Sequence, residues 1–232
     1  MSEKKTTTAR PPSSAFRAIA KGNLALLQAD AKSGLIDMSD TSSHTTILLE
    51  HAARYETSGT IIRWLVENKA DVNGTTDLHP LHFAVSCSQE SNAKLLIELR
   101  ANVNICGLNG NTSLMKAATN LLPASIKLLV DNGALVNAQD DDGKTALHFA
   151  AATMYSPTVD VQRVASTLLL LIQLKADASI ADKSGRKPRA DVATSHHEIQ
   201  SLFDIAPPPP VPAAPIAVVS SSSSVETQNQ KS

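Results

Sequence analysis

The chain has 232 residues, a formal net charge of −1 and only 3% aromatic residues. This length allows one sizeable core, and the near-neutral charge lacks the basic excess expected of a nucleic-acid-binding protein. No apolar run approaches the roughly 20 residues that span a bilayer, and two cysteines without CxxC spacing indicate reduced thiols, in the cytoplasm or the nucleus.

Residues 1–14 are polar and threonine-rich, so we expect a disordered N-terminal arm. They lack the apolar stretch of a secretory signal. A mitochondrial transit peptide is the alternative that Lys4, Lys5 and Arg10 suggest, although Glu3 and the shortness of the segment count against it. An ordered domain is therefore predicted from residue 15.

Two helix pairs are predicted before residue 74. In the first pair, an apolar stripe between Gly22 and Gly34 indicates an outer helix. In the second pair, about 41–73, the outer helix carries a stripe formed by Ile61, Ile62, Leu65 and Val66. Trp64 falls off that stripe, so we interpret it as a partly buried ring or, alternatively, as an exposed anchor for a partner.

One phrase then recurs at a fixed interval. It starts at residues 79 (HPLHFA), 112 (TSLMKA) and 145 (TALHFA), so each step is 33 residues. A second phrase closes the units at residues 69–73, 100–104, 133–137 and 175–179, as in RANVN and GALVN. A period of this size indicates one supersecondary unit that is copied and stacked.

The two phrases, T-P-L-H-x-A early and G-A-D-V-N late, resemble the ankyrin repeat over about residues 15–203, most specifically over 74–150. The resemblance implies an all-α fold, an ankyrin-repeat α-solenoid of about six units with β-hairpin fingers and disordered termini. The first and last units act as caps. It also implies that the side chains of His82 and His148 form hydrogen bonds to the loop between repeats. Asn73, Asn104 and Asn137 match a family position that can be hydroxylated. Our interpretation is that these asparagines have a structural role in the turn.

Within units three and four (74–106 and 107–139), several residue roles follow from the pattern. Leu81, Leu114 and Leu147 should point into the core, and Gly110 and Gly143 should turn the fingers with positive φ. Thr112 and Thr145 can cap their inner helices, while His79 takes that place in unit three.

Unit five, about 140–181, departs from the period. Ala146 and Ala176 are 30 residues apart, against 21 between Ser113 and Ala134, so nine residues are inserted at about 152–161. Ser156 followed by proline reads as an N-cap with proline at the first helical position. We therefore expect an outer helix lengthened at its start by two turns, about 12 Å.

The last unit, 182–203, is truncated, and Arg189 stands where a core leucine belongs. Ile199, Leu202 and Phe203 can still cover the end of the stack. Residues 204–232 form a low-complexity tail rich in proline and serine, which we expect to be disordered. Its prolines, from Pro207 to Pro215, favour polyproline II.

The sequence lacks the patterns of catalytic or metal chemistry. It has no GxSxG, Walker or GxGxxG motif. His196 and His197 are adjacent without a third ligand at suitable spacing, Asp140 to Gly143 lacks the glutamate that completes a calcium loop, and Cys87 has no basic neighbour in sequence. We therefore expect no enzyme, no cofactor and no metal.

The candidate site is a surface. By register, the finger positions include Thr75, Thr76, Leu78, Leu108, Asn109, Asn111, Asp141, Asp142, Lys144, Lys183 and Ser184. The exposed inner-helix ends and the inserted segment add Ser86, Cys87, Thr119, Asn120, Ala152, Thr153 and Tyr155. Leu78 and Leu108 are apolar at solvent positions, which indicates either a contact patch or ordinary scatter.

The predicted function is protein binding by a monomeric adaptor or regulatory subunit, through the concave face and the fingers. The alternative is a scaffold whose Pro-rich tail is a ligand for a partner of the SH3, WW, EVH1 or profilin type. No lysine or arginine flanks the prolines, which disfavours an SH3 partner, and a plain tail is the simpler interpretation.

Overall fold

A computed structural model describes residues 12–36, 44–55, 59–74, 79–156, 158–192 and 196–204. The predicted disordered arm and tail lie outside these residues, apart from their innermost positions. One boundary differs from the prediction, because the first helix begins at Ser13 and so takes in Ser13 and Ser14. Its N-cap, Pro12, has the extended conformation that precedes a helix.

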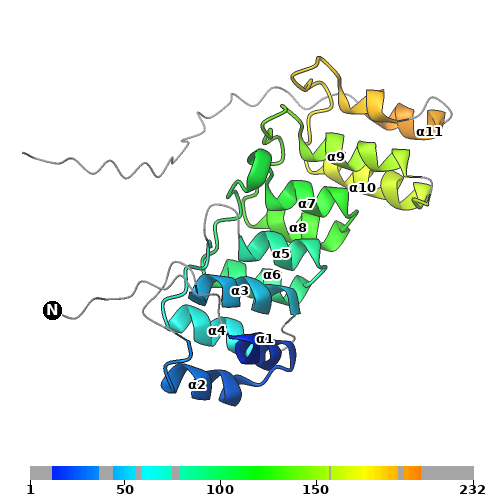
Figure 1. The fold of residues 1–232 in the computed structure, drawn as a ribbon. Coiled ribbons are helices and arrows are strands. Elements are labelled where there is room, and N and C mark those ends of the chain that lie inside the picture. Colours follow the sequence, from blue (N-terminus) through cyan, green and yellow to red (C-terminus); the bar gives the residue numbers. More distant parts are fainter. Residues whose placement is uncertain are drawn as a thin grey trace, which may run out of the picture.

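Helices come in antiparallel pairs that stack along one axis (Figure 1). The bounds are α1 Ser13–Ala20 and α2 Leu24–Lys32; α3 His44–Tyr55 and α4 Thr60–Glu67; α5 Pro80–Ser86 and α6 Glu90–Glu98; α7 Ser113–Thr119 and α8 Pro123–Asp131; α9 Ala146–Ala152 and α10 Val161–Gln173; α11 His197–Gln200. Short 3-10 turns are η1 Leu108–Gly110, η2 Thr153–Tyr155, η3 Pro188–Asp191 and η4 Ser201–Asp204.

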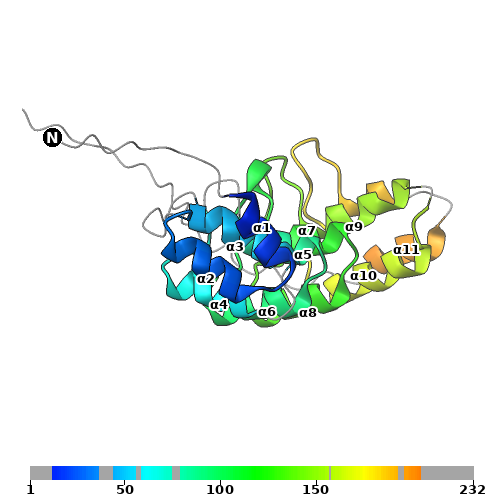
Figure 2. The same cartoon turned by 60° about the horizontal axis from the view of Figure 1, so that its bottom comes forward.

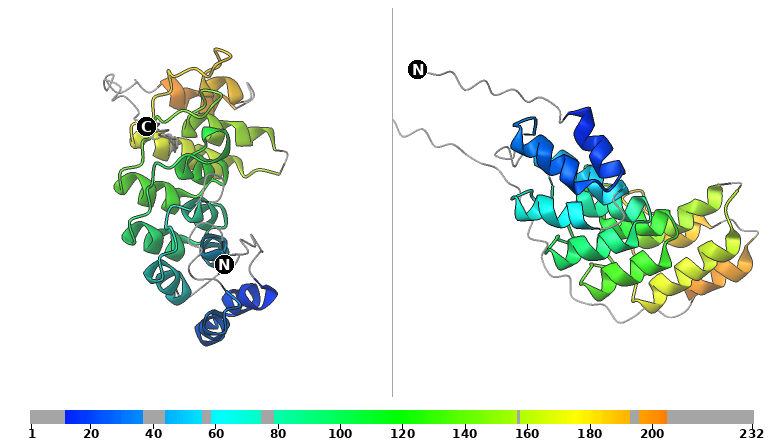
Figure 3. Two further views of the ribbon diagram at one scale, coloured as in Figure 1. Left: turned by 60° about the vertical axis from the view of Figure 1, so that its left-hand side comes forward. Right: turned by 90° about the horizontal axis from the view of Figure 1, so that it is seen from below.

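The helices form two layers. The inner layer holds α1, α3, α5, α7 and α9, and the outer layer holds their partners (Figure 2). Each inner helix contacts the next, and α6, α8 and α10 contact one another in sequence. Figure 3 shows the same stack from two further sides, with α1 and α2 at one end and α11 at the other. This arrangement confirms the predicted α-solenoid, with six units if η3 and α11 are taken as the last pair.

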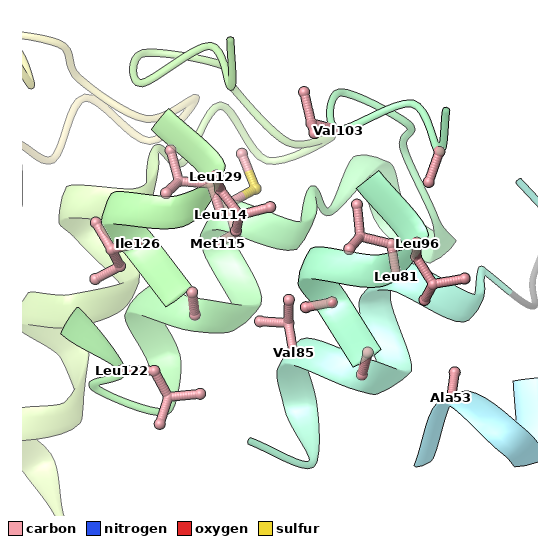
Figure 4. Packing of buried hydrophobic residues seen from close by; sticks show 14 of the residues in the cluster. Ala53, Leu81, Val85, Leu96, Val103, Leu114, Met115, Leu122, Ile126 and Leu129 are labelled. Carbon is pink, nitrogen blue, oxygen red and sulfur yellow. The ribbon is translucent and has the colours of Figure 1, made fainter. Parts of the chain in front are cut away.

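The core is a continuous band of aliphatic side chains between the layers. Leu81, Leu114 and Leu147 are 2%, 1% and 0% exposed, as their common place in the repeat predicts. In Figure 4, Leu81 and Leu96 of one unit and Leu114 and Leu129 of the next occupy equivalent places. Small alanines between them let successive inner helices approach closely.

The predicted inner-helix caps are partly confirmed. The Thr112 hydroxyl accepts a hydrogen bond from the Met115 amide at 3.3 Å, which closes the first turn of α7. In unit five, Thr145 instead contacts His148 Nδ1 through both its amide (3.1 Å) and its hydroxyl (3.0 Å). His79 does not cap α5 with its side chain, because its ring nitrogens face the carbonyl oxygens of Asn73 and Cys106.

The inserted segment of unit five differs from the prediction. Helix α10 begins at Val161, and its N-cap is Asp160, whose carboxylate accepts from Gln162 N at 3.0 Å and Arg163 N at 3.3 Å. Ser156 is not the cap, because it lies five residues before the first turn. At 13 residues α10 exceeds α8, with nine, by four, or about 6 Å of helix rather than 12. The other inserted residues form η2 and the connection after it.

The last unit closes the stack with few apolar residues. Pro188 and Val192 are buried, and Ile199, Leu202 and Phe203 pack on the same core, as predicted. Arg189, at the position of a core leucine, is exposed and forms an ion pair with Asp204. The arginine therefore points away from the core, and the unit lies at the end of the described stack.

Candidate functional site

The fingers are tight turns that project from the inner-layer side (Figure 2). An equivalent backbone hydrogen bond spans each finger: Gly107 N donates to Asn111 O at 2.9 Å, Asp140 N to Lys144 O at 3.0 Å, and Asp182 N to Arg186 O at 2.8 Å. None of the finger residues that the structure describes forms a β-strand, so the predicted hairpins are turns only. Gly110 and Gly143 have φ of 72° and 81°, as predicted.

Neighbouring fingers are joined by their backbones. The Asp141 amide donates to Asn109 O at 3.0 Å, and the Lys183 amide donates to Asp142 O at 2.8 Å. A Cβ atom at Gly110 would lie 2.9 Å from the Asp141 amide nitrogen, so only glycine allows this approach. The fingers of units four, five and six therefore form one connected ridge.

The ridge presents the following predicted residues. Leu108, Asn109, Asp141, Asp142, Lys183 and Ser184 are exposed, whereas Asn111 and Lys144 are half-buried. Leu108 is 64% exposed at the tip of its finger. Thr75, Thr76 and Leu78 lie outside the described residues. The structure thus places the remaining finger residues side by side on one ridge.

The charged side chains of the ridge interact with groups close to them in the sequence. Lys144 Nζ lies 3.3 Å from Asp142 Oδ2. The hydroxyl of Ser184 and the amides of Arg186 and Ser184 donate to the Asp182 carboxylate and lower its pKa. Partial burial and the neighbouring Asp141 raise the pKa of the Cys106 thiol, which keeps that thiol protonated.

A second surface runs across the inner helices beside the fingers. Residues three and four apart share one face of a helix, and on each inner helix one such face is half-buried or exposed while its neighbours are buried. We call this surface the inner-helix strip. It is formed by α3, by α5, α7 and α9, and by the residue that follows each of the last three helices. In turn it consists of His51, Arg54 and Tyr55; Phe83, Ser86 and Cys87; Lys116, Thr119 and Asn120; and Phe149, Ala152 and Thr153.

The strip includes residues that the sequence reasoning missed. It found the helix ends at Ser86, Cys87, Thr119, Asn120 and Thr153 but omitted one turn before them. That turn holds Phe83, Lys116 and Phe149, and the strip residues of α3, His51, Arg54 and Tyr55, were missed altogether. A signal for three of them was present, because 83, 116 and 149 are 33 residues apart and fall inside the recurring phrase.

Aromatic and basic side chains interlock on the strip. The Arg54 guanidinium carbon lies 3.8 Å from the centroid of the Phe83 ring, a cation–π contact between units two and three. The His51 ring lies 4.9 Å from Phe16 and 4.6 Å from Tyr55. Arg54 also forms an ion pair with Glu50 at 3.2 Å. Burial raises the pKa of the Glu50 carboxyl by more than the charge of Arg54 lowers it. The strip is therefore a surface of aromatic and charged side chains that contact one another.

The histidines of the repeated phrase hold the loops, as the resemblance implied. His82 Nε2 donates to Ile105 O and His148 Nε2 to Arg186 O, both at 3.1 Å. Burial, together with His79 and Lys116, lowers the pKa of His82 to about 4, in spite of the bond to Ile105. His82 is therefore neutral at physiological pH.

The asparagines of the second phrase join one unit to the next. Asn73 Oδ1 accepts from Asn102 N at 2.7 Å, Asn104 Oδ1 from Leu135 N at 2.8 Å, and Asn137 Oδ1 from Asp177 N at 2.8 Å. These bonds confirm the structural turn role. Hydroxylation of these residues stays a prediction.

The described residues show neither a metal-binding cluster nor a membrane-spanning helix. No group of three or more histidine, cysteine or acidic side chains in these ranges could hold a metal ion. None of the helices in the described part of the chain is both long and apolar enough to cross a membrane.

Comparison with known proteins gives one family and one set of relatives. The family model "Ankyrin repeats (3 copies)" matches residues 15–106 and 99–182. Human neurogenic locus notch homolog protein 1 is 37% identical over 121 residues, human homolog protein 2 is 36% identical over 126, and homolog protein 1 of Xenopus tropicalis is 35% identical over 123. The matches cover 51–53% of this chain but only 5% of each relative.

Proposed function

The chain belongs to the ankyrin-repeat family, whose repeats are protein–protein interaction modules, and we propose that it is a non-catalytic adaptor or regulatory subunit. It binds its protein partner through the finger ridge and the inner-helix strip together. The observation that carries this proposal is the strip itself, where half-exposed rings and cations lie beside the connected fingers.

Both surfaces have the features of a protein interface. Aromatic residues and arginine are enriched where partners bury surface. Aromatic rings supply large contact area with few rotatable bonds, and arginine supplies several hydrogen-bond donors on a planar group. The strip offers Phe83, Phe149 and Arg54, and the ridge offers the exposed Leu108. Since neighbouring fingers are hydrogen-bonded through their backbones, a partner meets a surface that is already ordered.

The test combines substitution of the ridge with capture of partners by the full chain. Replacing Asp141, Asp142 and Lys144 with alanine removes their side chains but keeps the backbone bonds between fingers. The exposed Asp142–Lys144 pair contributes at most about 1 kcal/mol, so the melting curve should stay nearly unchanged while partner binding weakens. Unchanged binding would contradict the ridge as a contact surface.

The alternative function is a scaffold whose tail binds a groove-bearing partner. Pro207 to Pro215 support it by composition alone, and they lie outside the described residues. Comparing the full chain with a chain that ends at Asp204 separates the two functions. If every partner were lost with the tail, the concave surface would not be the binding site.

A further inference from the structure

Aromatic residues are rare in this chain and yet gather on one side of it. There are seven in all, four Phe, two Tyr and one Trp. Five of them lie on the inner helices or on the turn that follows α9, namely Phe16, Tyr55, Phe83, Phe149 and Tyr155. Tyr55 and Tyr155 are 51% and 65% exposed. The three phenylalanine rings are half-buried, and Arg54 lies over that of Phe83. Surface aromatic rings are the groups on which proline rings pack.

The spacing of the strip suits one ligand conformation. Phe83 and Phe149 occupy the same repeat position on α5 and α9, with Lys116 between them on α7. Neighbouring packed helices lie about 8–10 Å apart. A polyproline II helix turns once every three residues and rises about 9 Å per turn. Every third residue of such a ligand would therefore meet the next inner helix.

The chain itself contains a segment of this kind. Residues 205–219 include six of the 12 prolines and no charged or hydrogen-bonding side chain. At every third position from Pro209 stand Pro212, Pro215 and Val218, which would form one apolar edge of a polyproline II helix. A segment this apolar gains free energy by leaving water, and its prolines lose little conformational entropy on binding.

The tail is long enough to run along the strip of its own chain. It continues from Asp204 in the last unit, whose η3 contacts α9. In polyproline II form, residues 207–219 span about 40 Å, whereas the four inner helices from α3 to α9 cover about 30 Å at the usual helix spacing. The short connection makes the effective concentration of the tail at the strip about millimolar.

We propose that residues 205–219 bind the inner-helix strip of the same chain as a polyproline II helix and cover it. The proposal rests on the proposed function, because it is the partner-binding surface that the tail occupies. Docking is autoinhibitory: a partner must displace the tail before it contacts Phe83, Lys116 and Phe149.

The first test compares amide NMR spectra of three full-length chains. The variant carries Pro209→Ser, Pro212→Ser and Pro215→Ser, and its matched control carries Ser221→Ala, Ser222→Ala and Ser223→Ala. We expect the proline variant alone to move the resonances of the strip, whereas those of α4, α6 and α8 stay in place. Shifts that are independent of protein concentration support docking within one chain. Concentration-dependent shifts would assign the tail to a second copy and overturn the proposal, as would an unmoved strip.

The second test adds a synthetic peptide of residues 205–219 to the proline variant. We expect the peptide to restore the wild-type positions of the strip resonances in the proline variant. It should bind the wild-type chain about tenfold more weakly than the variant, because the tail of the wild-type chain competes for the strip. Phe83→Leu and Phe149→Leu should weaken peptide binding, since leucine keeps the core contact but lacks the flat ring. Trp64→Leu, on an outer helix, is the matched control. Equal binding by all three variants would contradict the proposal.

These outcomes are separate from the test of the proposed function. If the strip ignores the peptide while the ridge variant still loses its partners, the docking proposal fails and the adaptor function stands. If the ridge variant binds its partners normally while the peptide occupies the strip, the ridge fails as a contact surface and tail docking is still supported.

Discussion

At the scale of single residues, one backbone position illustrates how the repeat tolerates imperfect sequences. The second residue after each of α4, α6, α8 and α10 has positive φ: 70° at Lys69, 73° at Arg100, 88° at Gly133 and 72° at Lys175. Only glycine adopts this left-handed conformation without steric cost. The three side-chain-bearing residues therefore carry a local penalty that the packing of the stack offsets.

Arg100 and Gly133 occupy the same position in successive repeats, so opposite substitutions at the two sites should change the free energy of unfolding in opposite directions. Gly133→Ala should lower the free energy of unfolding by about 1 kcal/mol, because a Cβ at φ of 88° is strained. No atom lies within 4 Å of that Cβ, so crowding adds nothing. Arg100→Gly should raise stability by up to about 1 kcal/mol. Urea unfolding measures both, and changes of the same sign would contradict the conformational explanation.

The buried His82 makes stability depend on pH. Its pKa is about 4 in the folded chain against an ordinary 6.5, so between these values the unfolded chain binds a proton that the folded chain does not. Stability should therefore be complete above pH 6.5 and fall as the pH drops towards 4, by at most about 3 kcal/mol. The groups that face His82 are His79, Lys116 and the Ile105 carbonyl.

Substitution separates this contribution from those of the other titrating groups. His82→Gln keeps an N–H donor for Ile105 O but cannot be protonated. Unfolding by urea, followed at several pH values from 7.5 to 4.5, should show a shallower loss for His82→Gln than for the natural chain. Parallel pH profiles would show that His82 does not carry the effect.

At the scale of elements, the connection before α10 shows why a regular period could not predict everything. Ser156, followed by proline, and Asp160 both fit the pattern of a helix start. Burial favours the later start, because Val164, Leu168 and Leu171 face the core from a helix that begins at Val161. Arg163 also holds the first turn by donating from Nε to Leu121 O at 3.1 Å. These tertiary contacts have no signal in the local sequence.

The cap of α10 is testable with a matched pair of variants. Asp160→Ala should lower the free energy of unfolding by about 1 kcal/mol, because the amides of Gln162 and Arg163 lose their acceptor. Ser156→Ala should have little effect, since Ser156 is exposed and its hydroxyl contacts that of Thr158 at 3.3 Å. If Ser156→Ala lowered the free energy of unfolding more than Asp160→Ala, the helix would begin after Ser156, as the sequence predicted.

Other elements were predictable because the repeat states their roles several times. The core leucines, the loop-holding His82 and His148, and the finger glycines each occur at a fixed place in the period. The strip was only partly predictable, since the exposed face of an inner helix depends on which side its neighbours cover. The ring of Phe83, for example, lies half-exposed beneath Arg54 of the neighbouring unit.

At the scale of the whole molecule, the stack is held together by short-range joints. Among the described helices the main contacts join each unit to the next, so stability is approximately the sum of unit and interface contributions. The asparagine bonds are the polar part of each interface. At the joint between units three and four, Asn104 Oδ1 accepts from Leu135 N and its Nδ2 donates to Gly133 O at 2.9 Å.

Removing that joint should weaken the cooperativity of the solenoid. Asn104→Ala deletes both bonds and should lower the free energy of unfolding by about 2 kcal/mol. The slope of that free energy with urea concentration should also fall, because the two halves of the stack then unfold less cooperatively. Hydrogen exchange should show unequal loss of protection on the two sides of the joint. Asn111→Ala is the matched control, because Asn111 Nδ2 donates only within its own finger, to Leu108 O at 3.0 Å. If both variants lost the same stability evenly along the chain, the asparagine joints would not couple the units, and packing between the inner helices alone would have to account for the cooperativity.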